Sequence, residues 1–128
     1  MKSILALTCG LLIGSSAIAN PPADNKAMIK LATDSGCMAC HQIEPGGKGP
    51  DGLAPIGPAW RDVSTKYKGD KKAEAALTHI VLTGSNPYES HWKGKVSGLA
   101  MPPNAVAIKA PEARKLVHWI LALEGKAK

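Results

Sequence analysis

Apolar residues recur three or four positions apart in several stretches of the chain, which is the spacing of one helix face. The first stretch follows the N-cap candidate Asp24 and ends at Gly36, where a left-handed C-cap is expected. A second helix is predicted to begin near Pro58, and a third to run from the N-cap candidate Asp70 to Gly84. The predicted inward faces of these helices are Met28, Leu31, Ala32 and Ser35; Trp60, Val63 and Tyr67; and Ala73, Leu77, Ile80 and Val81.

A fourth helix is predicted near the end of the chain. Pro111 suits its first turn, and Glu112 suits the positive end of the helix dipole. Its inward positions would be Leu116, Ile120 and Leu123, with Val117 and Trp119 flanking them and Gly125 ending the helix. Almost nothing in the sequence alternates as a strand would. We therefore predict an all-α fold.

The segments between these helices contain many loop-forming residues. The chain has 13 Gly and 10 Pro, and they gather in residues 42–59 and 85–110. It has no Phe, three Trp and two Tyr, so its 128 residues hold little aromatic bulk for one domain. Two such long loops are unusual in a small domain unless they enclose something. A large apolar prosthetic group would supply the missing core.

The first 19 residues have the layout of a secretory signal peptide. Lys2 gives a positive start, residues 4–13 are mostly apolar, and Ala17-Ile18-Ala19 is a small-residue cleavage site. The apolar stretch is short for a transmembrane helix, although a retained membrane helix is the alternative. Cys9 would suit a lipoprotein, but the apolar stretch continues past it. We expect a cleaved signal peptide at 1–19, a domain at 20–128, a periplasmic location and no stable membrane insertion after cleavage.

The charged residues give a modest positive excess. There are 16 Lys and Arg against 10 Asp and Glu, a formal net charge of +6. The lysines are scattered along the sequence, and no aromatic residues interleave with them as on a nucleic-acid-binding face. This pattern favours protein partners with acidic docking surfaces and gives no indication of nucleic-acid binding.

The segment Cys37-Met38-Ala39-Cys40-His41 is the attachment signature of c-type haem. Two thiols separated by two residues can each bond one vinyl group on the same porphyrin edge, and the next residue can bring an imidazole to the iron. A CxxC pair also occurs in redox dithiols and in zinc sites. The first needs a βαβ surround and the second needs another pair of ligands, and the sequence offers neither. We expect Cys37 and Cys40 to hold one haem c and His41 to ligate its iron.

The sixth iron ligand has to come from a distant segment. The candidates are Met28, Met38, Met101, His79, His91 and His118. We favour Met101 because Pro102 and Pro103 stiffen the loop that would present it. A thioether ligand also raises the reduction potential relative to a second imidazole. A methionine in a loop often only fills a gap in the packing, so two other candidates for the sixth ligand stay open. His91 is the second candidate and His79 the third.

Three motifs occur in order along the chain: GCMACH at 36–41, GPAWRDV at 57–63 and MPPNAV at 101–106, with Trp119 following. Together they resemble the small bacterial class I cytochromes c of the cytochrome c-551 type, across essentially all of residues 20–128. The resemblance implies the class I cytochrome c fold, about four helices wrapped around one covalently attached haem with His and Met axial ligands. It implies a periplasmic one-electron carrier that passes electrons between redox proteins, and not an enzyme.

The resemblance also implies roles for single residues. A backbone carbonyl near Pro58 would accept the imidazole N–H of His41 and fix the ring. Asn104 would hydrogen-bond near the sulfur of Met101. In the same way, Trp92 would reach a haem propionate.

Trp119 would pack where the first and last helices cross. Three features depart from the family pattern. The stretch 42–56 is longer than usual, and the first helix has Ala32 where the family often has an aromatic residue facing the last helix. Ile80 stands where a basic residue often approaches a propionate. The neighbouring His79 is more consistent with a solvent-facing residue.

Two rival functions remain beside the electron carrier. One is a haem enzyme or gas-binding sensor whose sixth ligand is displaceable or absent, and the Pro-stiffened Met101 argues against it. The other is a docked subunit of a larger oxidoreductase complex. That second hypothesis stays open, because the choice of partner resides in surface residues.

Overall fold

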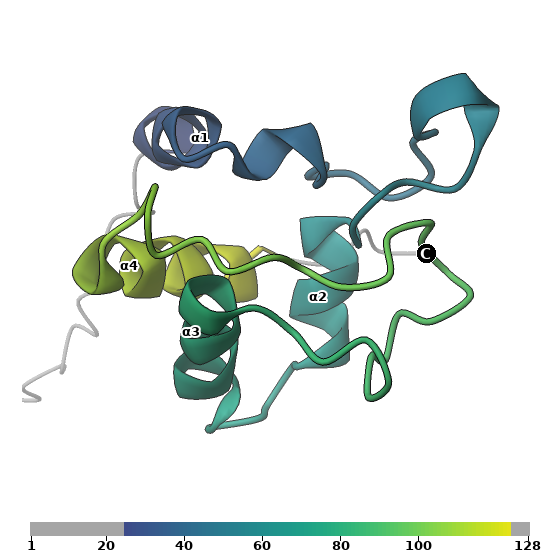
Figure 1. The fold of residues 1–128 in the computed structure, drawn as a ribbon. Helices are drawn as coiled ribbons and strands as arrows, with labels where there is room; N and C mark the ends of the chain where they lie inside the picture. The colour runs from purple at the N-terminus through teal and green to yellow at the C-terminus, as the bar shows by residue number, and fades with distance from the viewer. Residues whose placement is uncertain (1–24, 124–128) are drawn as a thin grey trace, which may run out of the picture.

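The computed structural model describes residues 25–123, and its helices all pack around the last one. Over that range the α-helices are α1 (Asn25–Asp34), α2 (Trp60–Lys66), α3 (Ala73–Thr83) and α4 (Ala110–Leu121). The described part of the chain contains no strand, only an isolated bridge between Lys93 and Val96. Helix α4 contacts each of the other three (Figure 1). The predicted all-α class is confirmed.

The predicted helix ends agree better with the structure than the predicted starts. Gly36 and Gly84 have φ angles of 75° and 87° and follow the ends of α1 and α3. Asp70, however, does not begin α3. Its carboxylate accepts a hydrogen bond from the backbone N–H of Lys72 at 2.8 Å, which caps a separate turn, and α3 begins at Ala73. The predicted signal peptide, Asp24 and Gly125 lie outside the described residues.

The crossing of α1 and α4 forms one side of the core. Met28 and Ala32 of α1 are buried, and Trp119 of α4 is buried among them. The Trp119 indole N–H donates to the Asn25 side chain at 2.8 Å, and its ring meets the edge of Trp60 from α2 with 5.7 Å between centroids. Trp119 therefore occupies the crossing that the resemblance implied, and it connects three helices.

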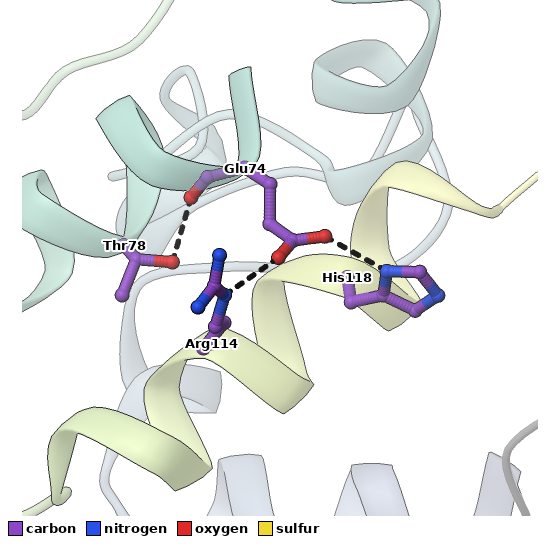
Figure 2. A network of polar contacts seen from close by, with 4 residues as sticks. All are labelled: Glu74, Thr78, Arg114 and His118. Carbon is purple, nitrogen blue, oxygen red and sulfur yellow. Dashed lines mark hydrogen bonds and ion pairs between the residues drawn. The ribbon is translucent and has the colours of Figure 1, made fainter. Parts of the chain in front are cut away.

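A polar cluster holds the outer side of α3 against α4 (Figure 2). The carboxylate of Glu74 accepts hydrogen bonds from Arg114 at 2.8 Å and from His118 at 2.9 Å, while its backbone carbonyl accepts from Thr78. The hydrogen bonds from His118 and Arg114 lower the pKa of Glu74. Because Arg114 and His118 are mostly exposed, solvent screening limits what this cluster contributes to stability.

The two long loops are tied to each other. The backbone N–H groups of Ser97 and Gly98 donate to the carbonyls of Pro55 and Ile56, at 2.9 and 3.0 Å. A Cβ atom on Gly98 would lie 2.5 Å from the Ile56 carbonyl oxygen, so this close approach requires glycine. The segment after α3 extends past α2 and returns toward α4 (Figure 1). These hydrogen bonds thus join the two long loops to each other.

Candidate functional site

A cavity of about 360 Å³ lies between the helices and the two long loops. Its walls are mostly apolar and come from α2, α3, α4, the segment after α1 and the loop that follows α3. The apolar wall residues of the helices are Trp60, Val63, Leu77, Ile80, Val81, Leu116, Val117 and Ile120. A cavity of this kind suits a largely apolar ligand with few polar contacts.

Cys37 and Cys40 lie in the wall of this cavity, on the turn that follows α1. Gly36 starts a short 3-10 turn, Cys37–Ala39, and the N–H groups of Cys40 and His41 both donate to the Cys37 carbonyl. Both cysteines are free thiols, and burial raises the pKa of Cys37. The turn therefore presents two thiols and the next imidazole to one cavity.

The His41 imidazole is fixed by its surroundings. Its Nδ1 donates to the Pro58 carbonyl at 2.8 Å, since a carbonyl can only accept, and its ring stacks on Trp60 with 5.9 Å between centroids. Burial lowers the pKa of His41, and the hydrogen bond to Pro58 only partly opposes that shift. The neutral ring keeps the Nε2 lone pair, which is the form that binds a metal. The resemblance implied that a backbone carbonyl near Pro58 accepts the imidazole N–H of His41. In the structure that acceptor is the carbonyl of Pro58.

Gly57 lets the chain pass close beside this ring. A Cβ atom at position 57 would lie 2.7 Å from Cε1 and 2.9 Å from Nδ1 of His41, and 3.1 Å from the Cys40 carbonyl oxygen. Its backbone N–H donates to that same carbonyl at 2.8 Å. The Gly-Pro pair therefore sets both the position and the tilt of the imidazole.

Replacing Gly57 with Ala is expected to displace the His41 ring and lower the yield of holoprotein several-fold. The added methyl group would meet ring atoms that the Pro58 hydrogen bond holds in place. Haem absorbance per milligram of purified protein measures the effect. Gly47→Ala is the matched control, because its Cβ would meet only the end of the Gln42 side chain. Equal haem content in the two variants would contradict the role assigned to Gly57.

Met101 also lies in the cavity wall, and both of its backbone polar groups bind Ser85. The Ser85 N–H donates to the Met101 carbonyl at 2.9 Å, and the Met101 N–H donates to the Ser85 hydroxyl at 2.8 Å. Gly84 permits this pairing, since its Cβ would lie 3.1 Å from the Met101 carbonyl oxygen and 3.0 Å from Pro103. The end of α3 thus holds the loop in place. Sequence reasoning missed this contact.

The other candidate iron ligands fall into two groups. Met28 is buried in the core, Met38 packs against that core, and His79 and His118 are exposed. None of those four side chains lines the cavity, whereas His91 does. The geometry therefore leaves Met101 and His91 as the residues that share the cavity with His41.

The Asn104 side chain has partners other than the one that the resemblance implied. Its amide donates to the Ser35 carbonyl at 3.1 Å and lies 3.9 Å from the sulfur of Cys37. Its backbone N–H donates to Val81 of α3 at 3.0 Å. Asn104 thus joins the loop of Met101 to the attachment turn, rather than acting on the Met101 sulfur alone. Ser35, which the helix pattern placed on the inward face, is buried at this contact.

Comparison with known proteins agrees with this arrangement. The family model described as cytochrome c matches residues 29–124, which include the attachment turn and the loop of Met101. The chain belongs to the cytochrome c family. Cytochrome c-551 of Allochromatium vinosum is 37% identical over 97 residues, covering 76% of this chain and 86% of that protein. Cytochrome c-551 of Pseudomonas aeruginosa is 33% identical over 116 residues, covering 91% and 89%.

A solved structure gives the same result for the fold. The crystal structure of Nitrosomonas europaea cytochrome c552 superimposes with a TM-score of 0.58 at 31% identity, covering 75% of this chain and 99% of that one. The protein is thus a small class I cytochrome c of the c-551 type, as the sequence motifs indicated. It is a haem-binding electron carrier with a covalently attached haem c.

The residues of the cavity fit that cofactor. Its walls are apolar, two free thiols lie in one wall, and an imidazole with an anchored Nδ1 lies beside them. Met101 is held in a neighbouring part of the wall. These residues match the chemistry of a porphyrin that is bonded through two thioethers and ligated by nitrogen and sulfur.

Proposed function

We propose that this cytochrome c is an exported one-electron carrier, with its haem bonded to Cys37 and Cys40 and its iron ligated by His41 and Met101. The observation that carries the proposal is that all four side chains line one apolar cavity. Two protein ligands would leave no open position for a substrate. The proposed role is therefore transfer of electrons between proteins and not catalysis on a bound molecule.

When bound, the haem supplies an iron that gains and loses one electron. The protein's part is to keep the surroundings of that iron the same in both oxidation states. The Pro58 carbonyl fixes the His41 ring, and Ser85 fixes the loop of Met101. Apolar side chains of α3 and α4 line the cavity and, with haem in place, would keep water from the iron. A rigid, dry site of this kind makes little rearrangement necessary when the charge changes.

The proposed docking surface lies on the two long loops. Lys48, Lys93 and Lys95 are exposed there, and so are the apolar residues Leu53 and Leu99, which are 61% and 83% exposed. Leu99 also lines the cavity. Exposed apolar side chains among lysines suit a transient contact with a redox protein whose docking face has an acidic rim.

Electron transfer to an acidic blue copper protein is expected to slow as salt is added. Exposed charges are screened within about 10 Å at 0.1 M salt, so steering by the lysines would weaken. Stopped-flow rates should fall several-fold between low and physiological ionic strength. Replacing Lys93 and Lys95 with Gln should remove much of that dependence, whereas Lys115→Gln on the outer side of α4 should not. Rates that are independent of salt would contradict a docking role for the lysines.

The proposed periplasmic location depends on the signal peptide. Over residues 25–123, no helix has both the length and the apolar character needed to cross a membrane. We expect the exported protein to begin at Asn20, after the Ala17-Ile18-Ala19 site. Intact mass of protein from the periplasmic fraction measures this directly. A holoprotein that still begins at Met1 would overturn the cleavage, and holoprotein only in the membrane fraction would overturn the location.

A further inference from the structure

A row of three aromatic rings runs from the proposed iron ligand toward the crossing of α1 and α4. The His41 imidazole stacks on Trp60 with 5.9 Å between centroids, and Trp60 meets the edge of Trp119 with 5.7 Å between centroids. Trp60 and Trp119 are 3% and 5% exposed, so both rings lie inside the protein. The indole N–H of Trp119 donates to the side chain of Asn25, an exposed residue at the start of α1. The row therefore connects the cavity with the surface.

Tryptophan differs chemically from the other apolar residues of this core. Its indole loses an electron to a strong oxidant far more readily than an aliphatic or phenyl side chain does, and the oxidised indole then releases its N–H proton. Both contacts in the row have the spacing of ordinary aromatic pairs. An electron from Trp119 could therefore reach the iron in two short steps, with Trp60 between them.

The third tryptophan has surroundings that disfavour the loss of an electron. Trp92 also lines the cavity, but the ammonium group of Lys95 lies 5.9 Å from the centroid of its ring. Removing an electron from Trp92 would place a positive charge beside an existing one, which costs electrostatic energy. At Trp119 the neighbour is instead the side-chain carbonyl of Asn25, a hydrogen-bond acceptor that would stabilise a positively charged indole. The surroundings thus favour oxidation of the buried pair over oxidation of Trp92.

We propose that Trp60 and Trp119 form a protective electron relay, which supplies an electron to the haem site when hydrogen peroxide attacks it. The proposal rests on the proposed function, because it takes haem to occupy the cavity and His41 to ligate the iron. Peroxide takes up two electrons and two protons and leaves as two molecules of water. In the reduced protein the iron gives one electron and becomes ferric. Trp119 gives the other electron through Trp60, together with its indole proton, and the second proton comes from solvent.

The relay moves the oxidised site away from the haem, to a place where it can be repaired. The proton of Trp119 leaves at the exposed side chain of Asn25. A small thiol in solution can return one electron and one proton to the Trp119 radical, and two of the resulting sulfur radicals join as a disulfide. Without a reductant, the radical instead takes up dioxygen and the indole is permanently oxidised. The position of that damage therefore records the path of the electron.

The first test is the position of the oxygen incorporated when the reduced holoprotein is incubated with hydrogen peroxide. Peptide mass spectrometry should find oxidised indole mainly at Trp119, and electron paramagnetic resonance of samples frozen early should show a tryptophan radical. Direct attack by dissolved oxidant would give the opposite order, because Trp119 is buried and Trp92 is only half-buried. Oxidation mainly of Trp92, or bleaching of the haem with no oxidised tryptophan, would overturn the proposal.

Replacements along the row give the second test. Trp119→Phe should make peroxide bleach the haem several-fold faster at an unchanged rate of cyanide binding, and Trp119→Tyr should restore much of the protection. Trp60→Phe should lower the oxidation of Trp119 several-fold. Trp92→Phe is the matched control, since it makes the same change in the cavity wall but outside the row, and it should leave the bleaching rate unchanged. Equal bleaching of the Trp119→Phe and Trp92→Phe proteins would contradict the relay.

A replacement at the surface avoids any repacking of the core. Asn25→Asp should raise the yield of oxidised Trp119, because a carboxylate accepts the indole proton more readily than an amide does. A negative charge also suits the first turn of α1, so the variant should fold normally. An unchanged yield in this variant would overturn the assigned exit of the proton, and with it the relay.

Covalent attachment separates this proposal from the proposed function. All variants should keep their haem through denaturing electrophoresis and keep the weak far-red band of sulfur-to-iron coordination. A changed pattern of damage then cannot come from loss of haem or of the Met101 ligand. Absence of covalent haem from the unmodified protein would overturn the proposed function and the relay together. Covalent haem with damage at Trp92 instead of Trp119 would overturn the relay alone.

Discussion

Replacing both Cys37 and Cys40 with Ser is expected to abolish covalent haem attachment completely and to prevent stable folding. Both thiols lie in the cavity wall, and neither forms a disulfide. Apolar side chains of α2, α3 and α4 all line this cavity, so the cofactor would supply a large part of the core. A chain with no Phe and three Trp has little other bulk to replace it.

Two measurements separate the loss of haem attachment from the loss of folding. Haem staining after denaturing electrophoresis shows attachment, and far-ultraviolet circular dichroism with thermal melting shows the fold. Each single variant, Cys37→Ser or Cys40→Ser, should keep some haem through the remaining thioether bond. Cys9→Ser is the control, because the expected signal peptide contains that residue. Haem that still migrates with the double variant would refute the attachment. A compact, helical, haem-free double variant would refute the structural role.

The turn that carries the two cysteines was predictable from the sequence because its determinants are local. The cysteines and His41 lie within five consecutive positions, and Gly36 just before them has the left-handed φ of 75° that the turn requires. The end of α3 at Gly84 followed from the same property of glycine. The start of α3 did not, because the Asp70 carboxylate caps a turn that ends before the helix begins.

Burial on α4 was underestimated from the helix pattern. The apolar spacing gives one inward stripe, with Val117 and Trp119 only flanking it. In the structure both are buried, because α1, α2 and α3 contact α4 from different sides. A helix surrounded in this way has no single inward face, and periodicity alone cannot indicate that.

The loops were the least predictable part of the site. The pairing of Ser85 with Met101 joins residues 16 positions apart in segments without periodicity. The contact of Asn104 with Ser35 spans 69 positions. Hydrogen bonds between irregular segments have no repeating pattern in a sequence, so only resemblance to known proteins suggested that Asn104 had a structural role at all.

Replacing Met101 with Ala is expected to open the iron to external ligands and to lower the reduction potential. Met101 lines the same cavity as His41, and Ser85 binds both of its backbone polar groups. The native protein should therefore show the weak far-red band of thioether coordination and bind cyanide or carbon monoxide slowly. The Ala variant should lose the band and bind both ligands at least tenfold faster. Met38→Leu, which changes a methionine that does not line the cavity, should leave band and rates unchanged.

A second replacement, Met101→His, tests coordination without opening the site. A second imidazole should keep the iron six-coordinate, so cyanide binding stays slow, while the potential falls because the identity of the axial ligand is a main control on it. Loosening the loop with Ser85→Ala should have an intermediate effect: the far-red band remains, but cyanide binds faster because one hydrogen bond, worth about 1 kcal/mol, is lost. If the native protein lacks the far-red band and binds cyanide quickly, Met101 is not the ligand. An open or weakly held iron would then favour a gas-binding or enzymatic role over the electron carrier, and His91 would become the residue to test at the iron.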